Sequence, residues 1–214
     1  MSLGSAVRKA FGRFEPAAIR VYRGAFIDLD ELATTIASVA PSAKRVLEIG
    51  CGDGAMAAAL CRSLPDAHLL GLDPAAKAPG RQFDGEPGRA EFRRIATTEL
   101  ISEGSGGFDL VMLCDVVHHV AESERGQVLL DAAALTSPGG TVVVKEWEHR
   151  AGMSTAFAYS ADRWVSGDAT VRFMPRTELD GLIEAAMPGW PVTCEARIPP
   201  RRANLLLTLR RPEN

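Results

Sequence analysis

The sequence lacks the features of a disulfide-stabilised, zinc-binding or membrane-spanning protein. It holds four scattered cysteines among its 214 residues and no Cys-x-x-Cys pair. This pattern argues against a disulfide framework or a zinc site and is typical of a reducing cytosol. No hydrophobic run approaches the roughly 20 residues needed to span a bilayer, and the N-terminus lacks the apolar core of a signal peptide. We therefore expect a cytoplasmic protein that does not enter a membrane.

The sequence also has few aromatic residues and little net charge. Aromatic residues make up 6%, and 24 lysines and arginines against 27 aspartates and glutamates give a net charge of -3. This weak acidic balance gives no reason to expect a nucleic acid as partner. The 46% of hydrophobic residues is ordinary for a soluble domain of this length with a sizeable core.

Short hydrophobic runs alternate with helical stripes along the chain, which is the pattern of an α/β protein with a mostly parallel sheet. We expect strands at 45–50, 68–73, 90–95, 108–114, 141–147, 192–198 and 203–210. Helices are expected over 15–39, 55–64, 123–137 and 177–187. Thr177 and Asp180 resemble a capping box at the start of the last helix.

These elements predict a single domain over residues 1–214 with three parts. An N-terminal helical segment covers 1–40, and a ligand-binding core covers 41–147. The remaining stretch of interest, 148–175, contains few recognisable core elements.

The most informative segment is the glycine-rich stretch after the first predicted strand. Glycines at positions 50, 52 and 54 follow the run Val46-Leu47-Glu48-Ile49, and a helical pattern begins directly after them. Such a strand–loop–helix lets the backbone approach a ligand closely, because glycine has no β-carbon. Asp73 ends the second predicted strand, where a carboxylate can accept hydrogen bonds from a ribose diol. These two features alone fit an NAD-binding protein as well as other nucleotide binders.

Further features distinguish between these possibilities. Glu48 lies within an otherwise apolar strand, where a carboxylate is costly unless it has a partner. The fourth and fifth strands have distinctive borders: Phe108-Asp109-Leu110-Val111, Asp115-Val116-Val117-His118-His119-Val120 and Pro138-Gly139-Gly140. Together with the glycine-rich stretch and Gly71-Leu72-Asp73, this ordered set resembles the class I S-adenosylmethionine-dependent methyltransferases. The resemblance covers about residues 40–147.

The resemblance implies a Rossmann-like sheet of seven strands, mostly parallel, with helices on both faces and the last strand antiparallel. It implies S-adenosylmethionine as cofactor, with its methionine part against Gly50, Cys51, Gly52 and Gly54. It places the ribose hydroxyls on Asp73 and the adenine beside Pro74. Cys114 and Asp115 would lie near the sulfonium and the methionine moiety, and Glu48 would orient the loop or the cofactor's amino group.

One departure from the family's pattern concerns the adenine. The third strand of this family often leads into Gly-Asp-Ala, whereas the matching stretch here is Ile95-Ala96-Thr97. The carboxylate is missing, so we expect backbone groups of Ala96 or the hydroxyl of Thr97 to bond the adenine instead.

Three residues are candidates for the chemistry of methyl transfer. His118 and His119 follow the fourth strand and Glu146 lies at the end of the fifth, where open α/β sheets place their ligands. Any of them could act as a general base for a protonated acceptor, with structural packing or a polar loop as the alternatives. We expect no metal site, because sequence neighbours such as the two histidines do not face one point on a helix.

The sequence therefore predicts an S-adenosylmethionine-dependent methyltransferase that acts on an oxygen, nitrogen or carbon atom of a small organic acceptor. The segment 148–175 is a candidate lid over that acceptor. An NAD(P)-dependent oxidoreductase is one alternative, since it shares the looser glycine pattern. A non-catalytic protein that keeps the methyltransferase fold is another.

Overall fold

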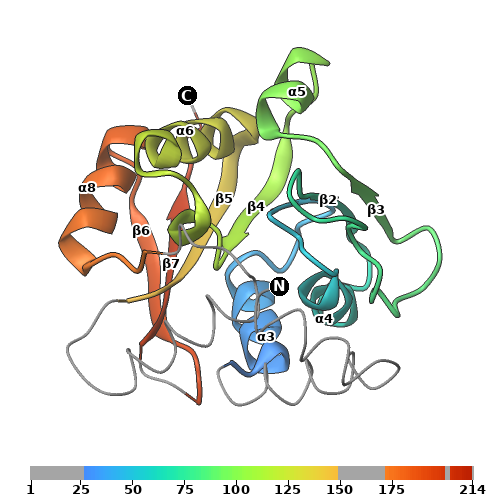
Figure 1. The fold of residues 1–214 in the computed structure, drawn as a ribbon. Coiled ribbons are helices and arrows are strands. Elements are labelled where there is room, and N and C mark those ends of the chain that lie inside the picture. Colours follow the sequence, from blue (N-terminus) through green and yellow to red (C-terminus); the bar gives the residue numbers. More distant parts are fainter. Residues whose placement is uncertain (1–26, 149–171, 201–202, 214) are drawn as a thin grey trace, which may run out of the picture.

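A seven-stranded sheet forms the centre of the computed structural model, which describes residues 27–148, 172–200 and 203–213 (Figure 1). The strand order is β3-β2-β1-β4-β5-β7-β6. The strands are β1 (Arg45–Ile49), β2 (His68–Leu72), β3 (Ala90–Arg93), β4 (Phe108–Cys114), β5 (Thr136–Trp147), β6 (Val192–Arg197) and β7 (Asn204–Arg210). Strands β1 to β5 pair in parallel, and β7 is antiparallel to both β5 and β6. The predicted Rossmann-like fold with an antiparallel last strand is confirmed.

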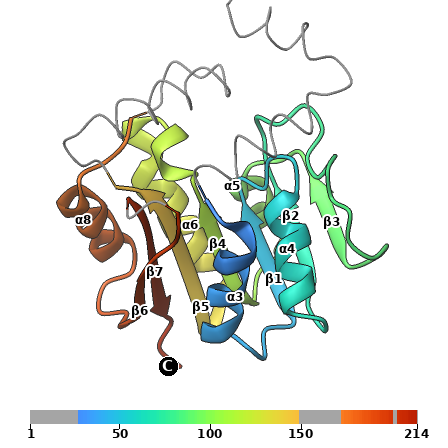
Figure 2. The ribbon, with the colours of Figure 1, turned by 90° about the horizontal axis from the view of Figure 1, so that it is seen from below.

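Helices cover both faces of this sheet (Figures 1 and 2). On one face lie α3 (Leu29–Val39) and α4 (Ala55–Ser63); on the other lie α5 (Thr97–Ser102), α6 (Arg125–Leu135) and α8 (Arg176–Ala186). Two short 3-10 helices, η2 (Val117–His119) and η3 (Glu122–Glu124), precede α6. Successive strand residues point to opposite faces, so each buried strand contributes side chains to two hydrophobic cores, one on each face of the sheet.

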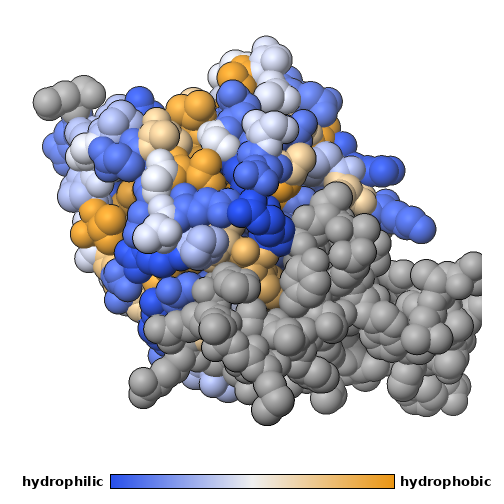
Figure 3. Space-filling view, turned by 60° about the vertical axis from the view of Figure 1, so that its left-hand side comes forward, coloured by the Kyte–Doolittle hydropathy of each residue, from blue (hydrophilic) through white to orange (hydrophobic). Residues whose placement is uncertain are grey.

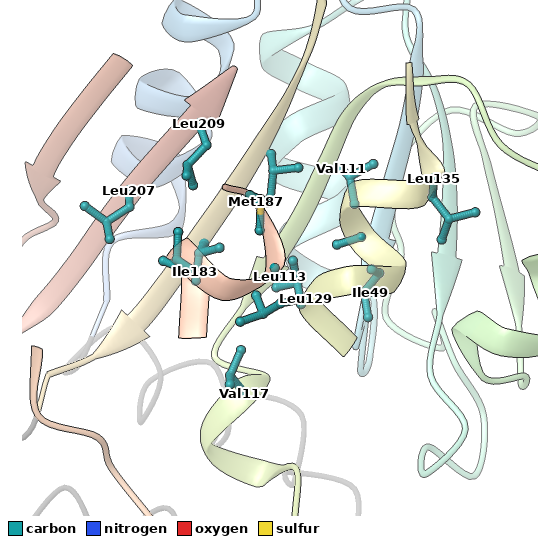
Figure 4. Close-up of a cluster of buried hydrophobic side chains, with 14 of the residues drawn as sticks. Ile49, Val111, Leu113, Val117, Leu129, Leu135, Ile183, Met187, Leu207 and Leu209 are labelled. Atoms are coloured by element: carbon teal, nitrogen blue, oxygen red, sulfur yellow. The ribbon is translucent and has the colours of Figure 1, made fainter. Parts of the chain in front are cut away.

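The two cores explain why the central strands are almost continuously hydrophobic. Val46 and Leu110 belong to the cluster beneath α3 and α4, while Leu47 and Val111 belong to the cluster beneath α6 and α8. Figure 4 shows this second cluster, in which side chains from the sheet meet those of α6 and α8. A strand that is buried on both faces needs a nearly continuous run of apolar residues, as β4 has from Leu110 to Cys114.

The arrangement of β1 and β4 determines where a ligand can bind. These strands are neighbours, but the chain leaves β1 through α4 on one face and leaves β4 through α6 on the other. Open α/β sheets bind ligands outside the carboxyl ends of the strands at such a topological switch point. We use "switch point" below for the carboxyl ends of β1 and β4.

β5 begins earlier than the predicted start at residue 141. It starts at Thr136, directly after α6, because Thr136 pairs with Phe108 on β4. Gly139 has a φ of 70°, and its N–H donates to the carbonyl of Arg211 at 3.1 Å. The Pro-Gly-Gly stretch therefore continues as an irregular strand, where we predicted only the end of a helix.

Two predictions about helices were wrong. α8 begins at Arg176 with Pro175 as its N-cap and no side-chain cap, so Thr177 and Asp180 form no capping box. Asp180 instead accepts a hydrogen bond from Arg176 at 2.6 Å. The structure also forms α5, where we predicted no helix.

The two predicted segments that flank the core are only partly described. Of the segment 1–40 the structure describes residues 27–40, which include α3. Of 148–175 it describes residue 148 and residues 172–175, so the predicted lid lies mostly outside the described residues. Among the described residues no helix has the length and apolarity to cross a membrane. The side that carries α8 and β6 is mostly hydrophilic, with hydrophobic residues scattered over it (Figure 3).

Candidate active site

The glycine-rich loop folds over the end of β2. The N–H groups of Gly50 and Cys51 both donate to the carbonyl of Leu72, at 2.7 and 3.0 Å. Gly50, Gly52 and Gly54 have φ values of 72°, 53° and 84°, which are left-handed conformations that glycine adopts without penalty. The backbone of the loop therefore favours glycine at all three positions.

The surroundings of the three glycines differ. A β-carbon at Gly50 would stand 2.5 Å from Cγ2 of Val116, and one at Gly54 would stand 2.8 Å from Cα of Gly80. At Gly52, no atom of the described part of the chain lies within 4 Å of that position. Gly50 and Gly54 therefore allow close packing within the protein, and Gly52 is the member of the loop with room for a ligand.

Asp73 ties the end of β2 to the glycine-rich loop. Its Oδ2 accepts from the N–H of Gly52 at 3.0 Å, and its Oδ1 accepts from the N–H groups of Ala75 and Ala76 at 2.9 and 2.8 Å. An ionised carboxylate has about four lone-pair sites, so capacity for a ligand hydroxyl remains. Pro74 follows on the exposed surface. Asp73 therefore caps this turn, and this role is compatible with ligand binding.

The connection from β2 to β3 lies against the glycine-rich loop, which sequence reasoning did not foresee. The N–H of Gly80 donates to the carbonyl of Gly52 at 3.1 Å, and the N–H of Gln82 donates to the carbonyl of Asp53 at 2.8 Å. The ring of Phe92 lies beside Gly80, where any β-carbon would be only 2.2 Å from it. The glycine at position 80 was the available signal for this close approach.

The two residues predicted to bind adenine already have partners in the protein. The N–H of Ala96 donates to Oε1 of Glu99 at 3.0 Å, and this contact begins α5. The hydroxyl of buried Thr97 donates to Oδ2 of Asp131 on α6 at 2.5 Å. The structure therefore assigns the polar groups of both residues to α5 and α6.

A buried lysine that we did not predict supports the residue after β4. Asp115 has a φ of 58°, which is unusual for a residue with a side chain. Its N–H donates to the carbonyl of Lys145 at 2.8 Å, and its Oδ2 lies 2.5 Å from Nζ of Lys145. The ammonium group of Lys145 is 1% exposed, whereas the side chain of Asp115 is 37% exposed. Asp115 is thus held at the switch point by two contacts from the neighbouring strand.

Carboxylates lie near two cysteine thiols at the switch point. Glu48 is buried within β1, where its side chain is expected to orient the loop. Burial and the carboxylates of Glu48 and Asp73 raise the pKa of the Cys51 thiol. Burial and the carboxylates of Glu48 and Asp115 likewise raise the pKa of the Cys114 thiol. Both cysteines therefore stay neutral and do not act as nucleophiles at neutral pH.

Glu146 is buried at the end of β5 and accepts three hydrogen bonds from one short stretch. The N–H groups of Val116 and Val117 donate to its Oε1 at 3.0 and 2.7 Å. Its Oε2 lies 2.5 Å from Nδ1 of His118, which is also buried. Burial alone would raise the pKa of Glu146, but His118 and the Val117 amide together lower it. The carboxylate is therefore ionised, and Nδ1 of His118 carries the proton that it accepts.

His119 is the more accessible of the two neighbouring histidines. Its side chain is half-buried, and the centroid of its ring lies 4.3 Å from that of His118. His118 contacts Phe173 on its other side, with ring centroids 5.1 Å apart. The pair therefore divides into one buried ring and one partly exposed ring.

The fold brings together three side chains that could in principle coordinate a metal ion and that are not adjacent in the sequence. Single atoms of Asp115, His118 and Glu146 lie within 4.8 Å of one another, as in some metal sites. The ammonium of Lys145 already donates to Oδ2 of Asp115, and His118 and Glu146 are hydrogen-bonded to each other. A cation would have to displace these contacts, so the donor set fits a hydrogen-bond network better than a metal ion.

The predicted site residues therefore lie along one edge of the sheet. The loop after β1, the turn after β2 and the connection after β4 meet at the switch point through the contacts of Gly52, Asp73 and Val116. Ala96 and Thr97 lie at the start of α5, at the end of β3. Lys145 and Val116 are the residues of this edge that sequence reasoning missed.

Comparisons with known proteins agree with this geometry. Residues 47–142 match the family model of a methyltransferase domain. The chain is 30% identical over 126 residues to a ubiquinone biosynthesis O-methyltransferase of Maricaulis maris, a match that covers 58% of this chain and 48% of the relative. The chain spans about half the length of the curated relatives it matches.

Solved structures share the fold. An O-methyltransferase family protein from Burkholderia thailandensis has a TM-score of 0.69 at 22% identity, covering 99% of this chain and 60% of that one. The 1,6-didemethyltoxoflavin-N1-methyltransferase from the same organism, solved with 1,6-didemethyltoxoflavin and S-adenosylhomocysteine, has a TM-score of 0.66 at 18% identity. That match covers 97% of this chain and 88% of the other.

Proposed function

We propose that the chain is a class I S-adenosylmethionine-dependent methyltransferase, which the methyltransferase-domain match over residues 47–142 supports, and that it transfers a methyl group to an oxygen, nitrogen or carbon of a small organic acceptor. The observation that carries this proposal is the open position at Gly52 beside the Asp73 carboxylate, at the switch point of the sheet. The names of the relatives, which include small-molecule O- and N-methyltransferases, support the acceptor class. The scattered cysteines support a cytoplasmic location.

We assign the cofactor to the carboxyl edge of β1, β2 and β4. The loop glycines and Cys51 would hold the methionine part, because Gly52 leaves room there and a side chain would not. Asp73 would accept a ribose hydroxyl, and Pro74 would lie beside the adenine. Asp115 and Cys114 would lie near the sulfonium and the methionine moiety. Glu48 would orient the loop from beneath.

The groups of Ala96 and Thr97 that we expected to bond the adenine have partners within the protein. The N–H of Ala96 and the hydroxyl of Thr97 are bonded to Glu99 and Asp131. We therefore propose that these two residues shape the adenine side of the site without donating to the ring.

Methyl transfer mainly requires that the protein align the acceptor with the methyl group of the cofactor. S-adenosylmethionine, when bound, supplies a methyl group on a positively charged sulfur that is a good leaving group. Holding the acceptor and cofactor in line is the main contribution of the chain, and it accounts for several kcal/mol of rate enhancement. Where the acceptor carries a proton, we propose that His119 takes it up, because its ring is the accessible one. His118 and Glu146 are bonded to each other, so we assign them to the support of His119.

Calorimetric titration separates this proposal from its alternatives. We expect the full chain to bind S-adenosylhomocysteine and not NAD, because the site is built for a methionine part and not for a second nucleotide. A screen of phenols, amines and activated carbon acids with S-adenosylmethionine would then identify the acceptor through the release of S-adenosylhomocysteine. Binding of NAD without binding of S-adenosylhomocysteine would refute the proposal. Binding of S-adenosylhomocysteine without turnover over a broad panel would favour a non-catalytic protein.

A further inference from the structure

The connection after β4 is held by an unusual number of contacts from separate elements. We call residues 115–120 the η2 connection, because η2 lies within it. Glu146 on β5 accepts from two of its main-chain N–H groups and from the His118 ring. A carboxylate that is 2% exposed is costly unless such partners are present. A single side chain thus holds three consecutive residues of the η2 connection, Val116 to His118.

Contacts from the other side hold the same stretch. The N–H of Arg172 donates to the carbonyl of His118 at 3.0 Å. The guanidinium of Arg125, which is 2% exposed, donates to the carbonyls of Val120 and Arg172 at 3.2 and 3.1 Å. It also pairs with Glu178 at 3.0 Å. The η2 connection is therefore fixed by β5, by α6 and by the residues that lead into α8.

The two oxygens of Glu146 have different tasks. Oε1 holds the amide of Val116, whose side chain lies against Gly50 in the glycine-rich loop. Oε2 holds the ring of His118, which in turn stacks on His119. One oxygen therefore supports the cofactor side of the switch point, and the other supports the half-buried histidine.

We propose that Glu146 is a positioning residue, which orients the His119 ring at the switch point by holding His118 through Oε2. It does not contact the acceptor itself, since both oxygens are engaged within the protein and the side chain is buried. This role rests on the proposed methyl transfer, because a positioned His119 has a chemical purpose only if an acceptor must lose a proton. Whether Glu146 orients the His118 and His119 rings, however, can be measured without enzymatic turnover.

The decisive variant is Glu146→Gln. The amide oxygen of glutamine can still accept from Val116 and Val117, whereas its NH2 group now faces Nδ1 of His118. His118 must then present Nδ1 as an acceptor and move its ring proton to Nε2. We expect a long-range 1H–15N NMR spectrum of the full chain to show this change of tautomer, together with shifted His119 ring signals. Affinity for S-adenosylhomocysteine should stay unchanged, because the Oε1 contacts remain.

Kinetics with an acceptor that supports turnover provide the second measurement. We expect kcat to fall about tenfold or more, toward the range seen when a general base is impaired, with the KM for S-adenosylmethionine unchanged. Glu195→Gln is the matched control, since Glu195 also loses a charge but lies on the edge strand β6, where it pairs with Arg176. It should alter neither the histidine signals nor kcat.

A second variant covers the case in which Glu146→Gln does not fold. His118→Phe keeps a ring for Phe173 and His119 to pack on but removes the Nδ1 donor, and it should shift the His119 signals in the same way. Unchanged His119 signals in the folded variants would overturn the proposal. That result is distinct from a failure of the proposed function, which would show as no binding of S-adenosylhomocysteine to the unmodified chain.

Discussion

Substitution of Gly52 by alanine tests the proposed cofactor site most directly. The residue has a φ of 53°, where alanine costs about 1–2 kcal/mol relative to glycine. No atom of the described residues would clash with the new methyl group. We therefore expect Gly52→Ala to fold and to lose roughly 1–2 kcal/mol of stability, which lowers Tm by about 2–8 °C for a chain of this size.

The same methyl group would stand in the space that we assign to the methionine part of the cofactor. We expect affinity for S-adenosylhomocysteine to fall by at least about tenfold, or ~1.4 kcal/mol, beyond any effect on folding. Isothermal titration calorimetry at a temperature well below the transition measures this loss separately from stability.

Gly104→Ala is a control matched in backbone strain. Gly104 has a φ of 74° and likewise has no described atom within 4 Å of a β-carbon, but it lies in the turn after α5. It should lower Tm by a similar amount and leave S-adenosylhomocysteine binding intact. Gly54→Ala should destabilise more than either, because its β-carbon would meet the Gly80 backbone. Normal S-adenosylhomocysteine affinity in Gly52→Ala would refute the assignment of the loop.

Three further predictions follow from individual contacts. Asp73→Asn should weaken S-adenosylhomocysteine binding by about 1–3 kcal/mol in calorimetry, since one of its two acceptor oxygens becomes an NH2 group that cannot accept from a ribose hydroxyl; unchanged affinity would mean that Asp73 is only a turn cap. Arg125→Met should cost about 3 kcal/mol in urea unfolding, because it strands buried partners, whereas the exposed pair of Arg62 with Asp30 should contribute less than about 1 kcal/mol. The lowered pKa of Glu146 means that its stabilisation is present above the ordinary value of 4.5 and is lost as the pH falls through the folded value. The difference in unfolding free energy between the unmodified chain and Glu146→Gln should therefore shrink below pH 4.5, and a difference that does not depend on pH would contradict this reasoning.

Short-range patterns in the sequence predicted the centre of the fold well. The apolar runs of β1, β2 and β4 and the stripe of α4 have periods that arise within a few residues, so they are visible without tertiary contacts. The start of β5 was different. We predicted residues 136–140 as the end of a helix. They extend the strand instead, because Thr136 pairs with Phe108 and Gly139 bonds Arg211.

Candidate site residues could be named from the sequence, but their individual tasks could not. Thr97 offered a hydroxyl for adenine, and the structure bonds it to Asp131, which lies 34 positions away. Glu146 was a candidate base, and the structure surrounds it with donors from residues 28 to 30 positions away. The first contact depends on how α5 packs against α6, and the others depend on the pairing of β4 with β5. No local pattern reveals either.

The sequence by itself determined the kind of protein: a parallel α/β sheet, a glycine-rich loop after its first strand and a carboxylate after its second. These features depend on residue type and spacing over short distances, because strands, turns and close backbone approaches follow local rules. Only the tertiary structure decided that Gly52 has open space while Gly50 and Gly54 pack against other residues, and that Glu146 holds His118. Those facts depend on which distant groups the fold brings within a few ångströms, and burial makes such contacts strong by excluding water.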